Sequence, residues 1–385
     1  MKTFLLKSWK TLIALAILAF LINASWYNYL FKGVYATYLQ GHTSGHIFDA
    51  AAFDLGHVEG PEIAQPWAEA LDIRWAPSSE LQGQLDDSET GAFLVIHRDS
   101  VRYEDYDHRV RRDTRTNSFS MAKSITTMMV QVAIEQGAIP SWETPVTTYF
   151  PELKGPGAER LTLSDLAGMT TDMDWIENYS NPFGITAKAV YGRDLRATVL
   201  NLDIGEQAGK EYQYQSGATA LLGMCLQEAT GTTPHEYASE VFWKHMGAEY
   251  DAEMHMDDEG QALCFTGFNA TARDFARFGK LVINEGQYDS LQLVDPEFFR
   301  VATEPTLYDY YGRSFWLDQV TLPSGEVQKI VALRGFLGQF IIVMPGRDMI
   351  IVRTGHDEGP RDGNGLPALF NTMCREYASR VSSKG

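Results

Sequence analysis

Ser120-Met121-Ala122-Lys123 places a serine three residues before a lysine, at the start of a stretch rich in Ala, Met, Val and Ile that ends at Gly137. That composition and the closing glycine predict a helix over residues 121–136. Residues three apart share a helix face, so the lysine amine should lie one turn behind the serine hydroxyl. A lysine with a lowered pKa can deprotonate a serine, and N–H groups at a helix start can stabilise an oxyanion. The tetrapeptide therefore makes Ser120 a candidate nucleophile and Lys123 its candidate base.

The composition is that of a globular protein. Hydrophobic residues make up 44% of the chain and charged residues 21%, without a low-complexity tract. The net charge of −18 argues against nucleic acid as a partner, because no basic surface would offset phosphate repulsion. Cys225, Cys264 and Cys374 are too few for a disulfide framework and are expected to be buried thiols. The sequence has no metal-ligand spacing and no nucleotide-binding glycine pattern, so neither a metal nor a cofactor is expected.

Residues 1–32 are expected to be an N-terminal membrane anchor or signal segment. The uncharged span Thr11–Phe31 lies between three lysines and Lys32, and it is long enough to cross a bilayer. Ile22-Asn23-Ala24 is a poor signal-peptidase site, which favours an uncleaved anchor over a cleaved signal. The expected location is the inner membrane with the body of the protein in the periplasm. The alternative is a secreted periplasmic protein after signal cleavage.

The rest of the chain divides into a lead-in region, residues 33–90, and one domain over residues 91–385. Two strand patterns, at 91–97 and 101–106, form a hairpin before the Ser120 helix. After that helix we expect helices at 163–169, 217–230, 235–246 and 271–285, strands at 313–321, 327–333, 339–344 and 349–354, and a last helix at 366–381. This order predicts an α+β fold, in which both ends of the domain form an antiparallel sheet and a helical lobe is inserted between them. Ser120 should lie in the cleft between sheet and lobe.

Two further motifs matter, because a chain of this length contains on the order of one Ser-x-x-Lys pattern by chance. Tyr214-Gln215-Ser216 precedes an apolar helix. A phenol near a lysine ammonium can have its pKa lowered and pass a proton to a leaving group; the alternative is a tyrosine that only packs. Arg334-Gly335-Phe336-Leu337-Gly338-Gln339 precedes a strand. Its glycines allow close approach to the strand edge, where a backbone N–H can be a second oxyanion donor; the alternative is a simple bend.

In this order, the three motifs resemble those of the serine β-lactamase-like superfamily, which includes class C β-lactamases, D-Ala-D-Ala peptidases, esterases and 6-aminohexanoate-dimer hydrolases. Ser120-Met121-Ala122-Lys123 matches the first motif, and Tyr214-Gln215-Ser216 takes the place of Tyr-x-Asn, with serine where asparagine is usual. Leu333-Arg334-Gly335 is similar to the Lys-Thr-Gly or His-x-Gly segment. The resemblance implies a β-lactamase/transpeptidase-like fold and an acyl-enzyme chemistry that needs no cofactor.

The chain departs from the β-lactamases and peptidases at the third motif. Their cation, which helps to hold a substrate carboxylate, is replaced by Leu333, although Arg334 is adjacent. The segment Asp174–Tyr179 looks more like the 6-aminohexanoate-dimer hydrolase branch, in which a loop tyrosine closes over the amide. The resemblance implies that Tyr179 has this position, and that Ser216, Arg334 and Gly335 also contact substrate.

The sequence thus predicts a serine hydrolase for small esters or linear amides. Ser120 attacks the carbonyl, Lys123 is the general base, and Tyr214 passes a proton to the leaving group. The backbone N–H groups of Ser120 and Phe336 hold the oxyanion. The alternatives are a β-lactamase or D-Ala-D-Ala carboxypeptidase, or a penicillin-binding or sensor domain that deacylates slowly.

Overall fold

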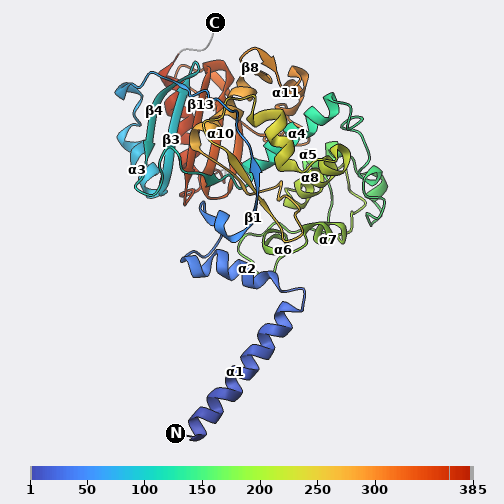
Figure 1. The fold of residues 1–385 in the computed structure, drawn as a ribbon. Coiled ribbons are helices and arrows are strands. Elements are labelled where there is room, and N and C mark those ends of the chain that lie inside the picture. Colours follow the sequence, from blue (N-terminus) through green and yellow to red (C-terminus); the bar gives the residue numbers. More distant parts are fainter. Residues whose placement is uncertain (1, 364, 382–385) are drawn as a thin grey trace.

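The computed structural model describes residues 2–363 and 365–381. Its centre is a seven-stranded sheet (Figure 1). The strand order is β10 (Trp316–Thr321), β11 (Val327–Gly335), β12 (Gln339–Met344), β13 (Met349–Gly355), β3 (Thr90–His97), β4 (Ser100–Tyr106) and β2 (Ala68–Glu69). All neighbours are antiparallel except β2 and β4. Because β13 pairs with β3, the two ends of the domain meet in the middle of the sheet, which confirms the predicted α+β fold.

Helices cover both faces of this sheet. On one face, α3 (Ser79–Asp87) and α12 (Ala368–Arg380) share an apolar cluster with alternate residues of the strands. On the other face, α4 (Met121–Glu135) and α10 (Ala272–Ile283) pack on the remaining apolar residues. Successive residues of β11 face opposite sides of the sheet. Leu333 packs on the α4 side, and Ala332 packs on the α12 side. This sandwich fixes α4 between the sheet and the helical lobe.

The helical lobe lies beyond α4, between β4 and β10 in the chain (Figure 1). Its helices are α5 (Leu163–Gly168), α6 (Ile185–Tyr191), α7 (Leu195–Leu200), α8 (Ser216–Thr230), α9 (Pro234–Ala238) and α11 (Pro296–Ala302). The helix expected at 235–246 is α9 followed by a π-helical turn at Ser239–Trp243. As predicted, Cys225, Cys264 and Cys374 are buried free thiols.

The N-terminal segment forms two helices, α1 (Lys2–Asn23), which extends away from the body, and α2 (Tyr29–Ala36), which packs against α6 (Figure 1). The expected membrane span over Thr11–Phe31 is not found. The uncharged stretch is divided between these two helices, and the described part of the chain contains no helix that is both long and apolar enough to cross a membrane.

The lead-in region contributes strands to both main sheets. β2 joins the central sheet, and β1 (Asp54–Val58) pairs with β6 (Ala252–Met256) in a second sheet that also contains β7 (Phe268–Ala270) and β5 (Thr116–Asn117). A small third sheet pairs β8 (Gln287–Tyr288) with β9 (Leu291–Gln292). The sequence patterns in residues 33–90 did not indicate these pairings.

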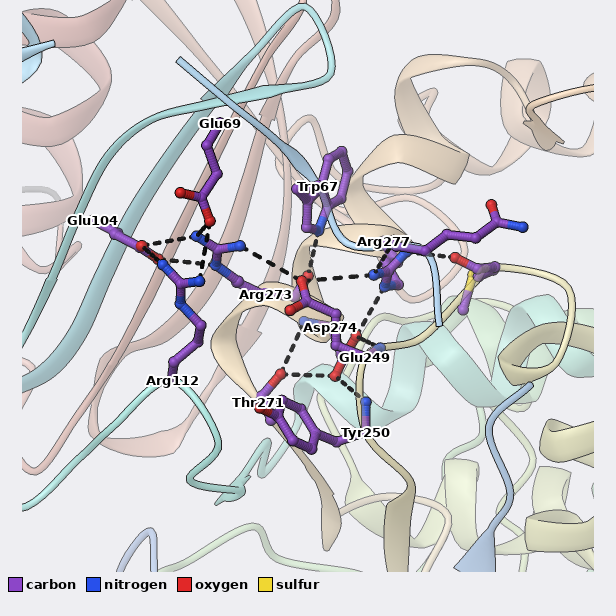
Figure 2. A network of polar contacts seen from close by, with 12 residues as sticks. Trp67, Glu69, Glu104, Arg112, Glu249, Tyr250, Thr271, Arg273, Asp274 and Arg277 are labelled. Carbon is purple, nitrogen blue, oxygen red and sulfur yellow. Dashed lines mark hydrogen bonds and ion pairs between the residues drawn. The ribbon is translucent and has the colours of Figure 1, made fainter. Parts of the chain in front are cut away.

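A polar network ties β2, β4 and α10 together (Figure 2). The guanidinium of Arg273 donates to Glu104 at 2.9 and 2.7 Å and to Glu69 at 2.9 Å, and its side chain is only 1% exposed. The indole N–H of Trp67 donates to the backbone oxygen of Arg273 at 2.9 Å. Arg112 bonds to the same two carboxylates from the outside. The network therefore anchors the lead-in region to the helix that covers the sheet.

We expect Glu104→Gln to destabilise the fold by about 3 kcal/mol, because it leaves the buried guanidinium of Arg273 without its principal counter-ion. Urea unfolding followed by circular dichroism measures the change. Asp105→Asn, at the exposed neighbouring position of β4, is the matched control and should shift stability by less than about 0.5 kcal/mol. Equal unfolding midpoints for the two variants would show that the network does not hold the lead-in region.

Candidate active site

Ser120 lies at a sharp turn between β5 and α4. Phe119, directly before it, has φ 45°, a left-handed conformation that costs a non-glycine residue about 1–3 kcal/mol. Asn117 holds the turn, since its Oδ1 accepts from the N–H groups of Phe119 (2.8 Å) and Gly267 (3.1 Å). Ser120 is the N-cap residue of α4, yet its hydroxyl makes no capping bond. The hydroxyl is therefore available for other chemistry.

Lys123 lies beneath that hydroxyl and is 1% exposed. Its Nζ donates to Ser120 Oγ at 2.8 Å and to the backbone oxygen of Phe265 at 2.9 Å. The rings of Tyr214 and Phe265 flank the amine, with centroids 5.2 and 5.7 Å away. Burial lowers the pKa of Lys123 to about 8, against a smaller opposing effect of Glu177. At neutral pH roughly a tenth of the molecules then carry the neutral amine, the form that can accept a proton.

Tyr214 also reaches the Ser120 hydroxyl. Burial raises the pKa of Tyr214, and the hydrogen bond with Ser120 lowers this pKa by a smaller amount. The expectation of a lowered pKa is wrong, because the rings of Tyr311 and Trp316 enclose the phenol, with centroids 6.2 and 5.6 Å away. Tyr214 thus keeps its proton at neutral pH.

The loop before α6 brings a carboxylate that sequence reasoning missed. Glu177 accepts from the N–H of Ser216 (2.7 Å), the hydroxyl of Ser216 (2.7 Å) and the indole N–H of Trp175 (2.7 Å). Burial raises the pKa of Tyr179, whose hydroxyl hydrogen bonds with Glu177 and Ser120. One carboxylate therefore positions two predicted substrate-contacting residues. The only sequence signal was an acidic residue two positions before Tyr179, in a loop with no regular period.

The third motif brings Phe336 to the site and leaves Arg334 outside it. The Phe336 ring packs edge-on against Phe119 and at a tilt against Tyr179, with ring centroids 5.6 and 5.1 Å away. The guanidinium of Arg334 lies over the ring of Trp316, 4.7 Å from its centroid, and contacts the α12 side of the sheet. Successive residues of β11 face opposite sides, and Leu333 faces α4. Arg334 does not line the cavity around Ser120.

Gly335 provides close backbone approach. A Cβ at this position would lie 2.2 Å from the backbone oxygen of Ser118. Only glycine lets β11 lie this close to the turn that carries Ser120. The structure therefore gives Gly335 a steric reason to be glycine that does not involve substrate.

A cavity opens at Ser120. It is lined by residues from the turn that carries Ser120, the loop that carries Tyr179, the third motif and the N-terminal region. Among these residues are Ser44, Gly45, Asp49, Asn117, Phe119, Ser120, Tyr179, Tyr191, Ser216, His255 and Phe336. Four of the predicted site residues, Ser120, Tyr179, Ser216 and Phe336, thus share one cavity. Within residues 2–363 and 365–381, no group of three His, Cys, Asp or Glu side chains is arranged to hold a metal ion.

A fold of this kind, with a serine and a buried lysine at its centre, is typical of one class of hydrolases. Comparison with known proteins identifies the family to which the chain belongs. Residues 80–369 match the family model described as Beta-lactamase. The chain belongs to this beta-lactamase family and is a hydrolase. The 6-aminohexanoate-dimer hydrolase of Paenarthrobacter ureafaciens is 28% identical over 321 residues, which cover 74% of this chain and 78% of that relative.

Solved structures show the same fold. A Bacillus anthracis protein proposed to be a 6-aminohexanoate-dimer hydrolase has a TM-score of 0.69 at 23% identity, covering 85% of this chain and 90% of that one. A D-stereospecific amidohydrolase from Streptomyces sp. has a TM-score of 0.60 at 13% identity, covering 79% of this chain and all of that one (100%). The resemblance inferred from the three motifs is confirmed at the level of family and fold.

The lowered pKa of Lys123 predicts a pH profile for acylation. The neutral amine is the active form, so kcat/KM should rise with pH and level off above about 8. Below that value it should fall about tenfold per pH unit, as the amine becomes protonated. Hydrolysis of a neutral p-nitrophenyl ester at several pH values, corrected for spontaneous hydrolysis, measures the profile. A rate that does not change across this range would exclude Lys123 as the base.

Glu177→Gln should lower kcat/KM by roughly 10- to 100-fold while the fold stays intact, because Tyr179 and Ser216 lose the carboxylate that positions them. Asp174→Asn, at an exposed position of the same loop, is the matched control and should retain activity. Ester hydrolysis and near-ultraviolet circular dichroism are measured on both variants. Wild-type kcat/KM in Glu177→Gln would show that the carboxylate is only structural.

Proposed function

We propose that the protein hydrolyses small esters or linear amides through an acyl-enzyme on Ser120, with Lys123 as general base. The observation that carries the proposal is the 2.8 Å contact between Lys123 Nζ and Ser120 Oγ, made by a lysine that burial shifts toward its neutral form. A serine hydroxyl needs such a base, and a neutral amine at this distance can take its proton as the oxygen attacks.

The remaining groups match the later steps of acyl transfer. The backbone N–H groups of Ser120 and Phe336 would hold the oxyanion of the tetrahedral intermediate. Tyr214, which keeps its proton, would donate it to the leaving amine or alkoxide and regain a proton from the Lys123 ammonium. Water would then attack the acyl group and give its proton to the same pair, releasing the acid and restoring Ser120.

The cavity favours neutral or cationic substrates over β-lactams. Among the described residues that line it there is neither lysine nor arginine. A β-lactam carboxylate would leave water without finding a cation, which costs several kcal/mol in a partly buried site. The Paenarthrobacter relative, named for hydrolysis of the 6-aminohexanoate dimer, also supports a linear amide as substrate.

Covalent labelling tests the nucleophile. A fluorophosphonate probe should add once to the wild-type protein and not to Ser120→Ala. Ser100→Ala is the control: it removes a hydroxyl at the start of β4 that bonds to the backbone oxygen of Arg98 at 3.3 Å, and it should still be labelled. Labelling that persists in Ser120→Ala would refute the assignment.

Activity measurements on the wild-type protein and on Ser120→Ala define the substrate class. p-Nitrophenyl butyrate and a linear amide should be hydrolysed with rates that depend on Ser120, whereas nitrocefin should be turned over weakly or not at all. Efficient nitrocefin turnover would instead support a β-lactamase, and a stable adduct with a β-lactam would support a slowly deacylating penicillin-binding domain.

A further inference from the structure

The short turn Phe336–Gly338 joins β11 to β12 and carries the backbone N–H group that faces the Ser120 side of the sheet. Leu337 has φ 60° and Gly338 has φ 74°, so two successive residues of the turn are in the left-handed region. This conformation is strained for leucine, and such strain persists only where the surrounding contacts hold it. The contacts that hold the turn therefore determine where the N–H of Phe336 points.

Arg353, on β13, binds two carbonyl groups of this turn. Its guanidinium Nη1 donates to the backbone oxygens of Leu337 at 2.7 Å and Gly338 at 2.9 Å. The arginine side chain is fully buried, and two glycines leave the room that it needs. A Cβ on Gly338 would lie 2.7 Å from Nη1, and a Cβ on Gly355 would lie 2.4 Å from Nη2. The guanidinium and the turn are thus packed directly against each other.

The other guanidinium N–H groups fix Arg353 itself. Nη2 donates to the backbone oxygens of Ser88 at 2.6 Å and Asp357 at 2.7 Å, and Nε donates to the hydroxyl of Thr90 at 3.1 Å. All five N–H groups of the guanidinium are therefore used, and their acceptors are four backbone oxygens and one hydroxyl. Burial lowers the pKa of Arg353 to about 9, so the side chain keeps its positive charge at neutral pH. The charge is spent on holding backbone segments together.

Gln339, the first residue of β12, binds the remaining carbonyl group of the turn. Its side-chain Nε2 donates to the backbone oxygen of Phe336 at 2.9 Å and to that of Gly355 at 2.8 Å. Its Oε1 accepts from the N–H of Gly355 at 2.9 Å. The backbone oxygens of all three turn residues are thus held by two buried side chains, one on β13 and one bound to the end of β13.

We propose that Arg353 and Gln339 are positioning residues, which hold the turn Phe336–Gly338 so that the N–H of Phe336 faces the oxyanion formed at Ser120. This inference rests on the proposed function, in which that N–H is the second oxyanion donor. Such a donor stabilises the transition state only when it lies about 2.7–3.1 Å from the oxyanion. Neither positioning residue lines the cavity, so both act through the turn and without contact to substrate.

Arg353→Lys tests the first of these contacts. Lysine keeps the positive charge, but its three donors cannot bind the two turn carbonyls and the other acceptors at once. We expect kcat for p-nitrophenyl butyrate to fall by roughly 10- to 100-fold. KM should change by less than about threefold, because the N–H binds the transition state and not the substrate. Arg347→Lys is the matched control: this buried arginine lies in the turn at the other end of β12 and pairs with Glu326 at 2.7 Å, so kcat should be retained.

A transition-state analogue separates positioning from a general loss of stability. Butylboronic acid accepts the Ser120 oxygen at boron and becomes a tetrahedral anion, so its inhibition constant should rise about tenfold or more in Arg353→Lys. The constant should stay unchanged in Arg347→Lys. Gln339→Met, which keeps the side-chain volume and removes the amide donor, should show the same changes as Arg353→Lys. Near-ultraviolet circular dichroism and urea unfolding report the fold of each variant.

Thr90→Val keeps the test decisive if the two larger changes prevent folding. It removes only the hydroxyl that accepts from Arg353 Nε, at a position outside the cavity, and kcat should still fall about threefold with KM unchanged. Wild-type kcat and unchanged inhibition by butylboronic acid in the variants that fold would overturn the positioning role and leave the Ser120 mechanism standing. Absence of probe labelling at Ser120 in the wild-type protein would instead refute the proposed function.

Discussion

The active site depends on keeping the amine of Lys123 out of water. A lysine has a long flexible stem and normally extends its charged end to solvent. Here α4 is held in place on both sides, because Ser124 bonds to the backbone of Ser314 and Thr126 to that of Cys264. The amine therefore stays beneath Ser120, where burial favours its neutral form. The proposed role of Lys123 as general base therefore depends on packing along the whole length of α4.

The charges around this base are arranged so that they do not cancel the effect of burial. A carboxylate in direct contact with Lys123 would restore the ammonium form and remove the base. Glu177 is near enough to act on the lysine pKa, but its oxygens are occupied by Ser216 and Trp175. The same bonds position the loop that carries Tyr179. One acidic side chain thus organises the substrate side of the site without taking the proton that the reaction needs.

The sequence predicted the helices and strands that are marked by a local pattern of apolar and polar residues. The Ser120 helix, the two strands after residue 90 and the strands near the C-terminus have clear periods, and the structure has them within a few residues of the expected bounds. The resemblance implied that Arg334 contacts substrate, whereas the alternation of β11 turns its side chain to the α12 side, outside the cavity. Glu177 could not be found, because it acts through contacts with Ser216, which is far from it in the chain. The pKa of Tyr214 was predicted in the wrong direction, since the enclosing rings of Tyr311 and Trp316 are distant in sequence from it.

The pairing of β13 with β3 has a consequence for the order in which the molecule is completed during synthesis. The chain segment with Ser120 leaves the ribosome long before β11, β12 and β13, which close the sheet beneath α4. Until then the apolar face of α4 lacks its partner strands, and Phe336, the proposed second oxyanion donor, is not yet in place. Such non-local closure slows folding and exposes apolar surface to aggregation in the meantime. Under the proposed mechanism, a nascent or C-terminally truncated chain carries the serine and the lysine without the second oxyanion donor, so hydrolytic activity should begin only when synthesis is nearly finished.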